Sequence, residues 1–231
     1  MVVFNASKTQ FLHLSTRHNL PHNYNVFFEN TQLTPSPVLN ILGVSFSRDL
    51  SWKDHISSLA KQASKRLGVL RRLKNFFTPP QLLSLYRGLV RPCMENASPI
   101  WGRSTHTALL GRMESRAVRL INSPTLTNSL QPLSARRIVA SLSLCYRYYN
   151  KHCSSELSGC MPPPLEWGRV TRLSTQSHPF FVKLSNPRLN CYASSFMYST
   201  SKVWNTLPFS IFPSSFDLHT FKSRVSRYVG L

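Results

Sequence analysis

The sequence predicts a mainly α-helical protein, with a small β region at its N-terminus, then a helical bundle, then an irregular, α-rich C-terminal segment. From residue 52 onward, apolar residues recur every three or four positions, which is the period of an amphipathic helix. Before residue 48, short apolar runs alternate with turn-forming residues, which is typical of strands. We therefore divide the chain into residues 1–48, 49–122 and 123–231.

Three apolar runs predict strands in the N-terminal region: FLHLS at 11–15, YNVFF at 24–28 and VLNILGVSF at 38–46. The segments RHNLPHN and TPSP lie between these runs and are rich in turn formers. The third run is almost wholly apolar, so we expect a strand that is buried on both faces.

A long helix is predicted over residues 52–75, because its apolar residues are spaced by three and four and form a single stripe. Asp49 or Ser51 could cap its start. The stripe consists of Trp52, Ile56, Leu59, Ala63, Leu67, Leu70 and Leu73.

The second predicted helix begins after TPP at 78–80, with Thr78 as its cap and proline in its first turn. Pro92 lacks a backbone N–H, so this helix should bend near Gly88. Its core stripe consists of Leu82, Leu85, Tyr86, Leu89, Val90 and Cys93. A third helix is predicted over 107–121, with Leu110, Met113, Ala117 and Leu120 facing inward.

On each of these three helices, a row of cations lies on the side away from the apolar stripe. If the stripes are buried together, the rows stay outside, and we expect them to face one way and to contact a nucleic-acid backbone. A charge run of this kind is often only a solvated surface, and the large net charge of the chain is what favours phosphate contact. The predicted contacts are Lys61, Lys65, Arg66, Arg72, Arg87, Arg91, Arg112, Arg116 and Arg119.

The C-terminal segment predicts fewer regular elements. SPTLTNSLQP at 123–132 and MPPPLEWG at 161–168 are breaks, and a fourth helix is predicted between them over 134–151. A polar, Ser- and Pro-rich stretch then leads to SSFMYSTSKVWNTLP at 194–208, and a short helix over 217–230 closes the sequence.

Charge is the strongest functional signal. The 231 residues include 28 Lys and Arg against 8 Asp and Glu, a formal net charge of +20, and such a protein attracts polyanions. We expect nucleic acid as the partner, and neither a membrane nor a small-molecule substrate. A membrane-surface role for the basic helix over 52–75 is less favoured, because the neighbouring stripes can bury its apolar side.

Three features that the sequence lacks indicate the cellular compartment of the protein. It has no secretory signal and no apolar run near the ~20 residues that cross a bilayer. Its five cysteines have no regular spacing, which indicates a reducing compartment. We expect a soluble, intracellular protein that is not secreted, with the nucleus as a candidate location.

Acidic residues are too few and too dispersed in the sequence to predict catalysis. Metal-assisted phosphoryl transfer needs clustered carboxylates, and only Asp49 and Asp54 lie near each other in sequence, although folding could assemble a cluster. The spacing of the nearest Cys and His residues fits no standard zinc pattern, so we expect no metal, no cofactor and no catalytic residue in this chain. These residues are Cys145, His152, Cys153 and Cys160.

Several short motifs, in order along the chain, resemble the reverse transcriptases of non-long-terminal-repeat retrotransposons, the jockey-like LINE group of animals. NASKT at 5–9 is similar to the family's Asn-x-x-Lys-Thr element, and ILGV at 41–44 to the Leu-Gly segment after it. The further pieces are LSWKDHI at 50–56, KRLGVLRRL at 65–73, Leu85-Tyr86 with Pro92, SPIWG at 98–102, VASL at 139–142, YRY at 146–148, TR at 171–172, SHP at 177–179 and VWNTLP at 203–208. Each piece is weak alone, and their common order carries the resemblance.

The resemblance implies that 1–48 is the end of a palm with a primer-grip-like segment, 49–122 a helical thumb, and 123–231 a family-specific C-terminal segment. Lys8 would then lie near the incoming nucleotide, and Leu42 with Gly43 would belong to the primer-grip-like segment. The basic face of the thumb would follow a template–primer duplex. The full-length family would use magnesium.

One departure from the family bears on activity. Family catalysis depends on palm aspartates, two of them in a Tyr-x-Asp-Asp element upstream of the element that resembles 5–9. The sequence begins at Met1 and contains no adjacent pair of aspartates, so we expect a truncated, inactive fragment of an RNA-directed DNA polymerase that still binds nucleic acid electrostatically. The alternative is a repurposed basic helical module that binds nucleic acid without catalysis.

Overall fold

The computed structural model describes residue 5 and residues 8–15, 25–166 and 178–230. It is 56% helix and 9% strand, with the strands near the N-terminus, which confirms the mainly α class. The predicted RHNLPHN turn and the TR motif at 171–172 lie outside the described residues, as do two residues of the NASKT motif.

Two separate antiparallel hairpins form the β region. In the first, β1 (Val26–Phe28) pairs with β2 (Thr31–Leu33). In the second, β3 (Val38–Ile41) pairs with β4 (Val44–Ser47), with Val38 opposite Ser47. Residues 11–15 do not form the predicted strand; Phe11 makes an isolated bridge to Pro35, and the Ser15 N–H donates to the Arg48 carbonyl at 3.3 Å.

The predicted single strand over 38–46 is wrong, because the chain reverses at Leu42 and Gly43. Both residues have positive φ, 48° and 82°, which suits a tight two-residue hairpin turn. Within β3, β4 and this turn only Val44 is fully buried, and Leu42 is 95% exposed. An apolar run therefore folds back on itself here instead of crossing a core.

Helix α1 (Lys53–Leu73) follows β4 and buries the predicted stripe from Ile56 to Leu70. Neither predicted cap is used, because Trp52 is the N-cap in a left-handed conformation with φ 61°. The Asp49 carboxylate instead accepts hydrogen bonds from the Ser51 N–H, at 3.1 Å, and from the Ser47 hydroxyl. Asp49 thus stabilises the turn that leads into α1.

The second predicted helix is α2 (Pro79–Leu85), η2 (Tyr86–Val90) and α3 (Arg91–Glu95), which run on without a break. Thr78 is the N-cap as predicted, and its N–H donates to the Gln81 side chain at 2.9 Å. In place of a simple bend near Gly88, η2 is a π-helical turn. Such a wide turn accommodates Pro92, which cannot donate to the preceding turn.

This π turn changes which side chains of the helix point inward. One extra residue per turn rotates everything after it by about 100° around the axis. Leu89, predicted in the core, is therefore 46% exposed, whereas Met94, outside the predicted stripe, is fully buried.

The bundle is completed by α4 (Ser98–Trp101), η3 (Thr105–Thr107), α5 (Ala108–Ile121) and α6 (Pro124–Thr127). Trp101 is fully buried, and its indole N–H donates to the Asn96 carbonyl at 3.0 Å, so it anchors the core. A Cβ at Gly102 would lie 2.5 Å from the Ser98 carbonyl oxygen, which explains the glycine after this tryptophan.

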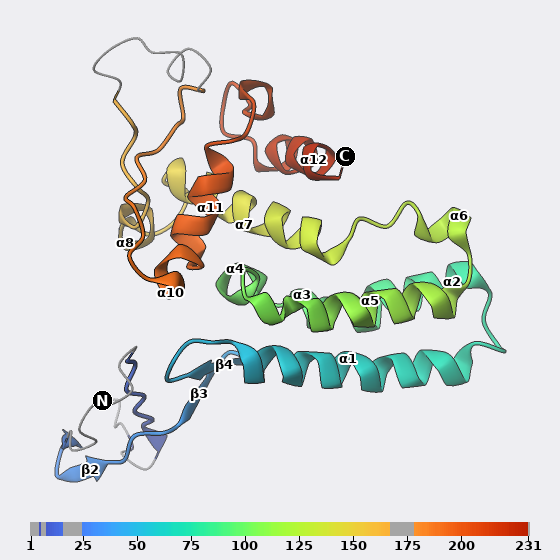
Figure 1. Cartoon of the computed structure of the whole chain (residues 1–231), viewed down its shortest axis with the longest axis horizontal. Coiled ribbons are helices and arrows are strands. Elements are labelled where there is room, and N and C mark those ends of the chain that lie inside the picture. Colours follow the sequence, from blue (N-terminus) through green and yellow to red (C-terminus); the bar gives the residue numbers. More distant parts are fainter. Residues whose placement is uncertain (1–4, 6–7, 16–24, 167–177, 231) are drawn as a thin grey trace.

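The C-terminal segment contains α7 (Leu133–Tyr149), α8 (Ser155–Gly159), α10 (Asn190–Ala193), α11 (Phe196–Trp204), η4 (Phe209–Ile211) and α12 (Leu218–Val229). Asp217 caps α12 by accepting from the Thr220 N–H at 3.0 Å. In Figure 1, α7 lies between the bundle of α1, α3 and α5 on one side and the helices α11 and α12 on the other.

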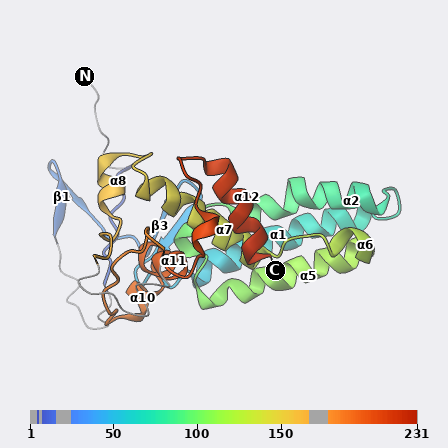
Figure 2. The ribbon, with the colours of Figure 1, turned by 90° about the horizontal axis from the view of Figure 1, so that it is seen from above.

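Two hydrophobic cores are described. The first joins α1, α2 to α5 and the first residue of α7, Leu133, and the second joins α7 from Val139 onward to α11 and α12. Leu126 and Leu130, which the sequence division assigns to the C-terminal segment, pack against the first core. Figure 2 shows the bundle helices extending toward α6, away from the hairpins at the other end.

Candidate nucleic-acid interface

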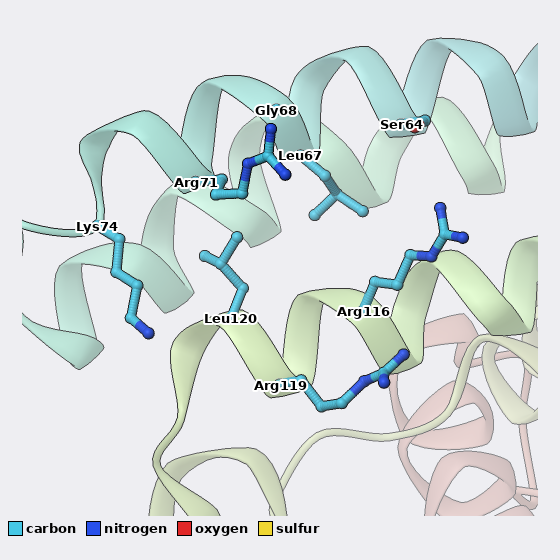
Figure 3. A pocket seen from close by; sticks show the side chains of 8 residues that line it. All are labelled: Ser64, Leu67, Gly68, Arg71, Lys74, Arg116, Arg119 and Leu120. Carbon is cyan, nitrogen blue, oxygen red and sulfur yellow. The ribbon is translucent and has the colours of Figure 1, made fainter.

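A groove of about 620 Å³ lies between the C-terminal halves of α1 and α5. Its floor contains Leu67 from α1 and Leu120 from α5, which point toward one another in Figure 3. Leu120, which was predicted to face inward, is partly buried against the first core and also lines the groove, and Ile121 is the fully buried residue of this turn. Beside them, Gly68 leaves open space, since a Cβ there would meet no atom within 4 Å.

Four exposed cations surround this apolar floor, and the described residues that line the groove include no carboxylate. The cations are Arg71, Lys74, Arg116 and Arg119. Cations near a helix C-terminus interact favourably with the helix dipole, which stabilises the helix by about 0.3–1 kcal/mol. This interaction does not explain why the cations of both helices lie around the same groove. Four like charges around a concave surface create a positive potential that attracts anions.

The groove combines two residues that were predicted as contacts and two that were not. Arg116 and Arg119 belong to the predicted row on α5, whereas Arg71 lies on a flank of the predicted stripe and Lys74 has no predicted role. One sequence signal could have indicated Arg71 as a groove residue. Ser64, Gly68 and Arg71 are spaced at i, i+4 and i+7, and two small residues in line with a cation leave a hollow beside it.

The other predicted cations of α1 do not line the groove. Lys61, Lys65 and Arg72 are exposed, and they lie about a quarter to a third of a turn around α1 from Arg71. On α5, Arg112 is exposed but likewise outside the groove lining. Lys61, Lys65 and Arg72 form an outer row next to the groove.

Arg66 and Arg87 lie on the side of η2. The Arg66 guanidinium donates to the carbonyl of Leu89, inside the π turn, so part of its donor capacity supports the helix. Arg87 lines a second hollow of about 470 Å³, together with Glu95 and Arg136. Because a carboxylate lies in this hollow, it is a weaker site for anions than the groove.

Arg91, which was predicted to contact nucleic acid, is only 7% exposed and lines the second hollow beside Glu95, not the groove. The π turn rotates it inward, where its guanidinium donates to the Gln131 carbonyl at 2.8 Å. It lies 3.7 Å from the carboxylate of Glu95 and 4.0 Å from that of Glu114.

Arg91 belongs to a half-buried ion-pair network between α3, α5 and α7. Arg136 binds Glu95 with two donors, one of them at 2.9 Å, and Glu114 accepts the Leu133 N–H at 3.1 Å. Burial raises the pKa of Glu114, against the opposing effect of the Leu133 hydrogen bond and of Arg91. Burial also lowers the pKa of Arg137, the third arginine of this network.

The described Lys and Arg side chains form ion pairs only in this network. The three predicted rows therefore do not face one way: one part lines the groove, one part forms the outer row, and Arg91 is inside. The groove and the outer row beside it remain open to an anion.

Lys8, Leu42 and Gly43 lie far from the groove. The hairpin of β3 and β4 adjoins the start of α1, whereas the groove adjoins its end, and a helix of 21 residues is about 30 Å long. Lys8 is exposed on the N-terminal segment, and the Leu42–Gly43 turn is exposed at the hairpin tip. The roles that the resemblance implies for them, near the nucleotide and the primer, would therefore lie at the opposite end of α1 from the groove.

Metal ligands are not assembled in the described part of the chain, which contains no group of three Cys, His, Asp or Glu able to hold an ion. The Cys145 thiol is buried against the Met161 sulfur at 3.8 Å, and burial raises its pKa. His152 stacks on Phe216 with ring centroids 3.6 Å apart, and Cys160 is exposed.

Comparisons with known proteins add no identification. Neither the protein-family models, nor the curated proteins, nor the solved structures contain a match to this chain. The resemblance to LINE reverse transcriptases therefore depends on the sequence motifs alone. Among the described residues, no helix combines the length and the apolar character of a membrane span.

Proposed function

We propose that this protein binds the backbone of a nucleic-acid template–primer without regard to sequence, as the thumb-containing part of a LINE-type reverse transcriptase. The observation that carries the proposal is the groove between α1 and α5, where four cations meet and no carboxylate among the described lining residues competes with phosphate. Phosphate contacts of this kind supply affinity and position, whereas base contacts supply sequence preference.

The distribution of carboxylates supports the same proposal. Glu95 and Glu114 are occupied by arginines in the interior, so they neutralise buried charge and leave the outer cations of the described chain unpaired. An exterior with a large excess of positive charge attracts a polyanion and speeds its association.

The carboxylates of this chain favour binding of nucleic acid without catalysis. The magnesium ions that the resemblance implies for the full-length family do not fit here, because the two carboxylates that the fold brings together are bound by arginines. We therefore propose no polymerase step for this chain. A repurposed nucleic-acid-binding module would use the same groove, and a primer-extension assay should give no product in either case.

The test is the salt dependence of binding to a labelled duplex with a single-stranded template extension, followed by fluorescence anisotropy. Each phosphate contact contributes about −0.9 to the slope of log K against log salt for a duplex and about −0.7 for a single strand. Replacing Arg71, Lys74, Arg116 and Arg119 with Gln should weaken binding and make the slope shallower by about 3 to 4.

A matched control separates the groove from net charge. Replacing four exposed cations of the C-terminal segment with Gln changes the charge equally but leaves the groove intact, and it should alter the slope much less; these are Lys183, Lys202, Lys222 and Arg227. Charge reversal of Lys61, Lys65 and Arg72 should also weaken duplex binding. Equal losses in the groove and control variants, or binding that is insensitive to salt, would contradict the proposal.

A further inference from the structure

An exposed phenylalanine follows the last groove residue of α1 along the chain. Phe76 is 80% exposed, two residues after Lys74, in the turn that follows α1. Its N–H donates to the Leu73 carbonyl at 2.9 Å, which keeps the chain in a turn and holds Phe76 near the end of the helix. An aromatic ring exposed to this extent gains little from the fold.

The neighbouring residue shows that this exposure is not a general property of the turn. Phe77 is partly buried and packs against the first core, so the chain places one ring inside and the next one outside. A single exposed apolar residue needs no explanation by itself. Here Phe76 follows the lining residue Lys74 by two positions, and the combination of phosphate-binding charges with an exposed aromatic ring nearby is typical of single-strand binding sites.

The shape of the groove also distinguishes one strand from two. An α-helix of about 10–12 Å fits into the major groove of a duplex, so a duplex is wider than a helix and cannot enter the hollow between two helices that pack together. A duplex could touch only the tips of the cations at the rim. A single phosphodiester strand can reach down to Leu67 and Leu120.

We propose that the groove between α1 and α5 binds a single-stranded segment of nucleic acid, with its phosphates between Arg71, Lys74, Arg116 and Arg119 and one base stacked on Phe76. This proposal rests on the proposed function and narrows it to the unpaired template strand next to a duplex. The duplex itself would lie on the outer row of Lys61, Lys65 and Arg72.

The experiment measures binding of the full chain to three labelled probes: a single-stranded DNA of about 12 nucleotides, a blunt duplex of the same sequence, and an abasic strand of the same length. Phe76→Ala should weaken single-strand binding about 5- to 150-fold, the range that loss of one stacked base covers. It should leave the blunt duplex and the abasic strand unchanged. Phe76→Trp should retain single-strand affinity, and Tyr228→Ala, at an exposed aromatic of α12, is the control.

A second variant blocks the groove without changing any charge. Gly68→Leu places a side chain in open space on the floor, and it should weaken single-strand and abasic-strand binding while the blunt duplex is unaffected. The control is Gly111→Leu on α5, where a Cβ also meets no atom within 4 Å but which does not line the groove.

The outcomes separate this proposal from the one it rests on. If the unaltered chain binds none of the probes, the proposed function itself fails. If it binds duplex and single strand in a salt-dependent way but Phe76→Ala and Gly68→Leu change neither, only the single-strand site is overturned. Tighter, Phe76-dependent binding to vesicles of phosphatidylserine and phosphatidylcholine would also overturn it in favour of a membrane surface.

Discussion

The groove and the interior network are two regions built from the same residue type with opposite results. In the groove, Arg71, Arg116 and Arg119 are exposed, and no carboxylate of the described chain lines it beside them. In the network, Arg91 and Arg136 are held by Glu95 and Glu114. Only 8 acidic residues accompany 28 basic ones, so each carboxylate placed inside leaves fewer to neutralise the groove. Location, and not residue type, decides whether an arginine stabilises the fold or is free to bind.

Removing a carboxylate from the network should give the largest effect. Glu114→Gln leaves the buried Arg91 and Arg137 with Glu95 as their one nearby carboxylate, which Arg136 also binds, and breaking a buried pair in this way costs about 3 kcal/mol of unfolding free energy. Urea unfolding followed by circular dichroism measures the change. Glu156→Gln, at an exposed carboxylate of α8, is the control and should leave the unfolding midpoint unchanged.

Acidification should destabilise the interior and leave the groove unaffected. The Nδ1 atoms of His55 and His178 accept the N–H groups of Ser45 and Phe180, at 3.3 and 3.1 Å, and burial lowers the pKa of both histidines. Below the ordinary histidine pKa of about 6.5 the unfolded chain then binds more protons than the folded chain.

Stability should therefore be full above about pH 6.5 and should fall as the pH drops toward the lower folded-state pKa values. The urea midpoint between pH 7.5 and 5 measures this loss. Among the described residues that line the groove there is no histidine, so single-strand affinity should hold as long as the chain stays folded. An unchanged midpoint in that interval would show that these two histidines are not held neutral by the fold.

The π turn that brings Arg91 into the network can be tested at Pro92. Pro92→Ala restores a backbone N–H, but Arg91 and Met94 remain packed inside, so the turn should persist. The expected loss is about 0.5–1 kcal/mol, since proline restricts the unfolded chain. A loss of several kcal/mol in urea unfolding would mean that the proline, and not the packing, holds the turn.

The groove should give the smallest effect on stability. Replacing Arg116 and Arg119 with Gln removes none of the ion pairs of the described chain, so unfolding free energy should change by less than about 0.5 kcal/mol while nucleic-acid binding weakens. Parallel urea and anisotropy measurements check both parts. A large loss of stability in this variant would show that the groove arginines, like those of the network, stabilise the fold.

Elements whose signals are local were predictable. The stripe of α1, the capped start of α2 at Thr78 and the row of arginines on α5 all follow from patterns within one helix. The long helices are therefore predictable to within a few residues. What spacing cannot describe is a change of period, and the π turn at Tyr86–Val90 moved Leu89 out and Arg91 in.

The candidate site was only half predictable for a related reason. Arg116 and Arg119 are predictable because they belong to a row of arginines on one helix. Lys74 belongs to no such row, and it lines the groove because α5 packs beside the end of α1. The contact between Glu95 and Arg136 joins residues 41 positions apart, so it has no sequence signal either. The same holds for the Leu42–Gly43 turn, where an apolar run folds back on itself.

The sequence by itself determined the mainly α class, the positions of the long helices and the surplus of positive charge, because these depend on composition and on periodicity within each segment. Only the tertiary structure decided which arginines face water and which face carboxylates. That choice depends on how helices pack against one another and on a single wide turn that rotates one of them, and neither is written in a local pattern.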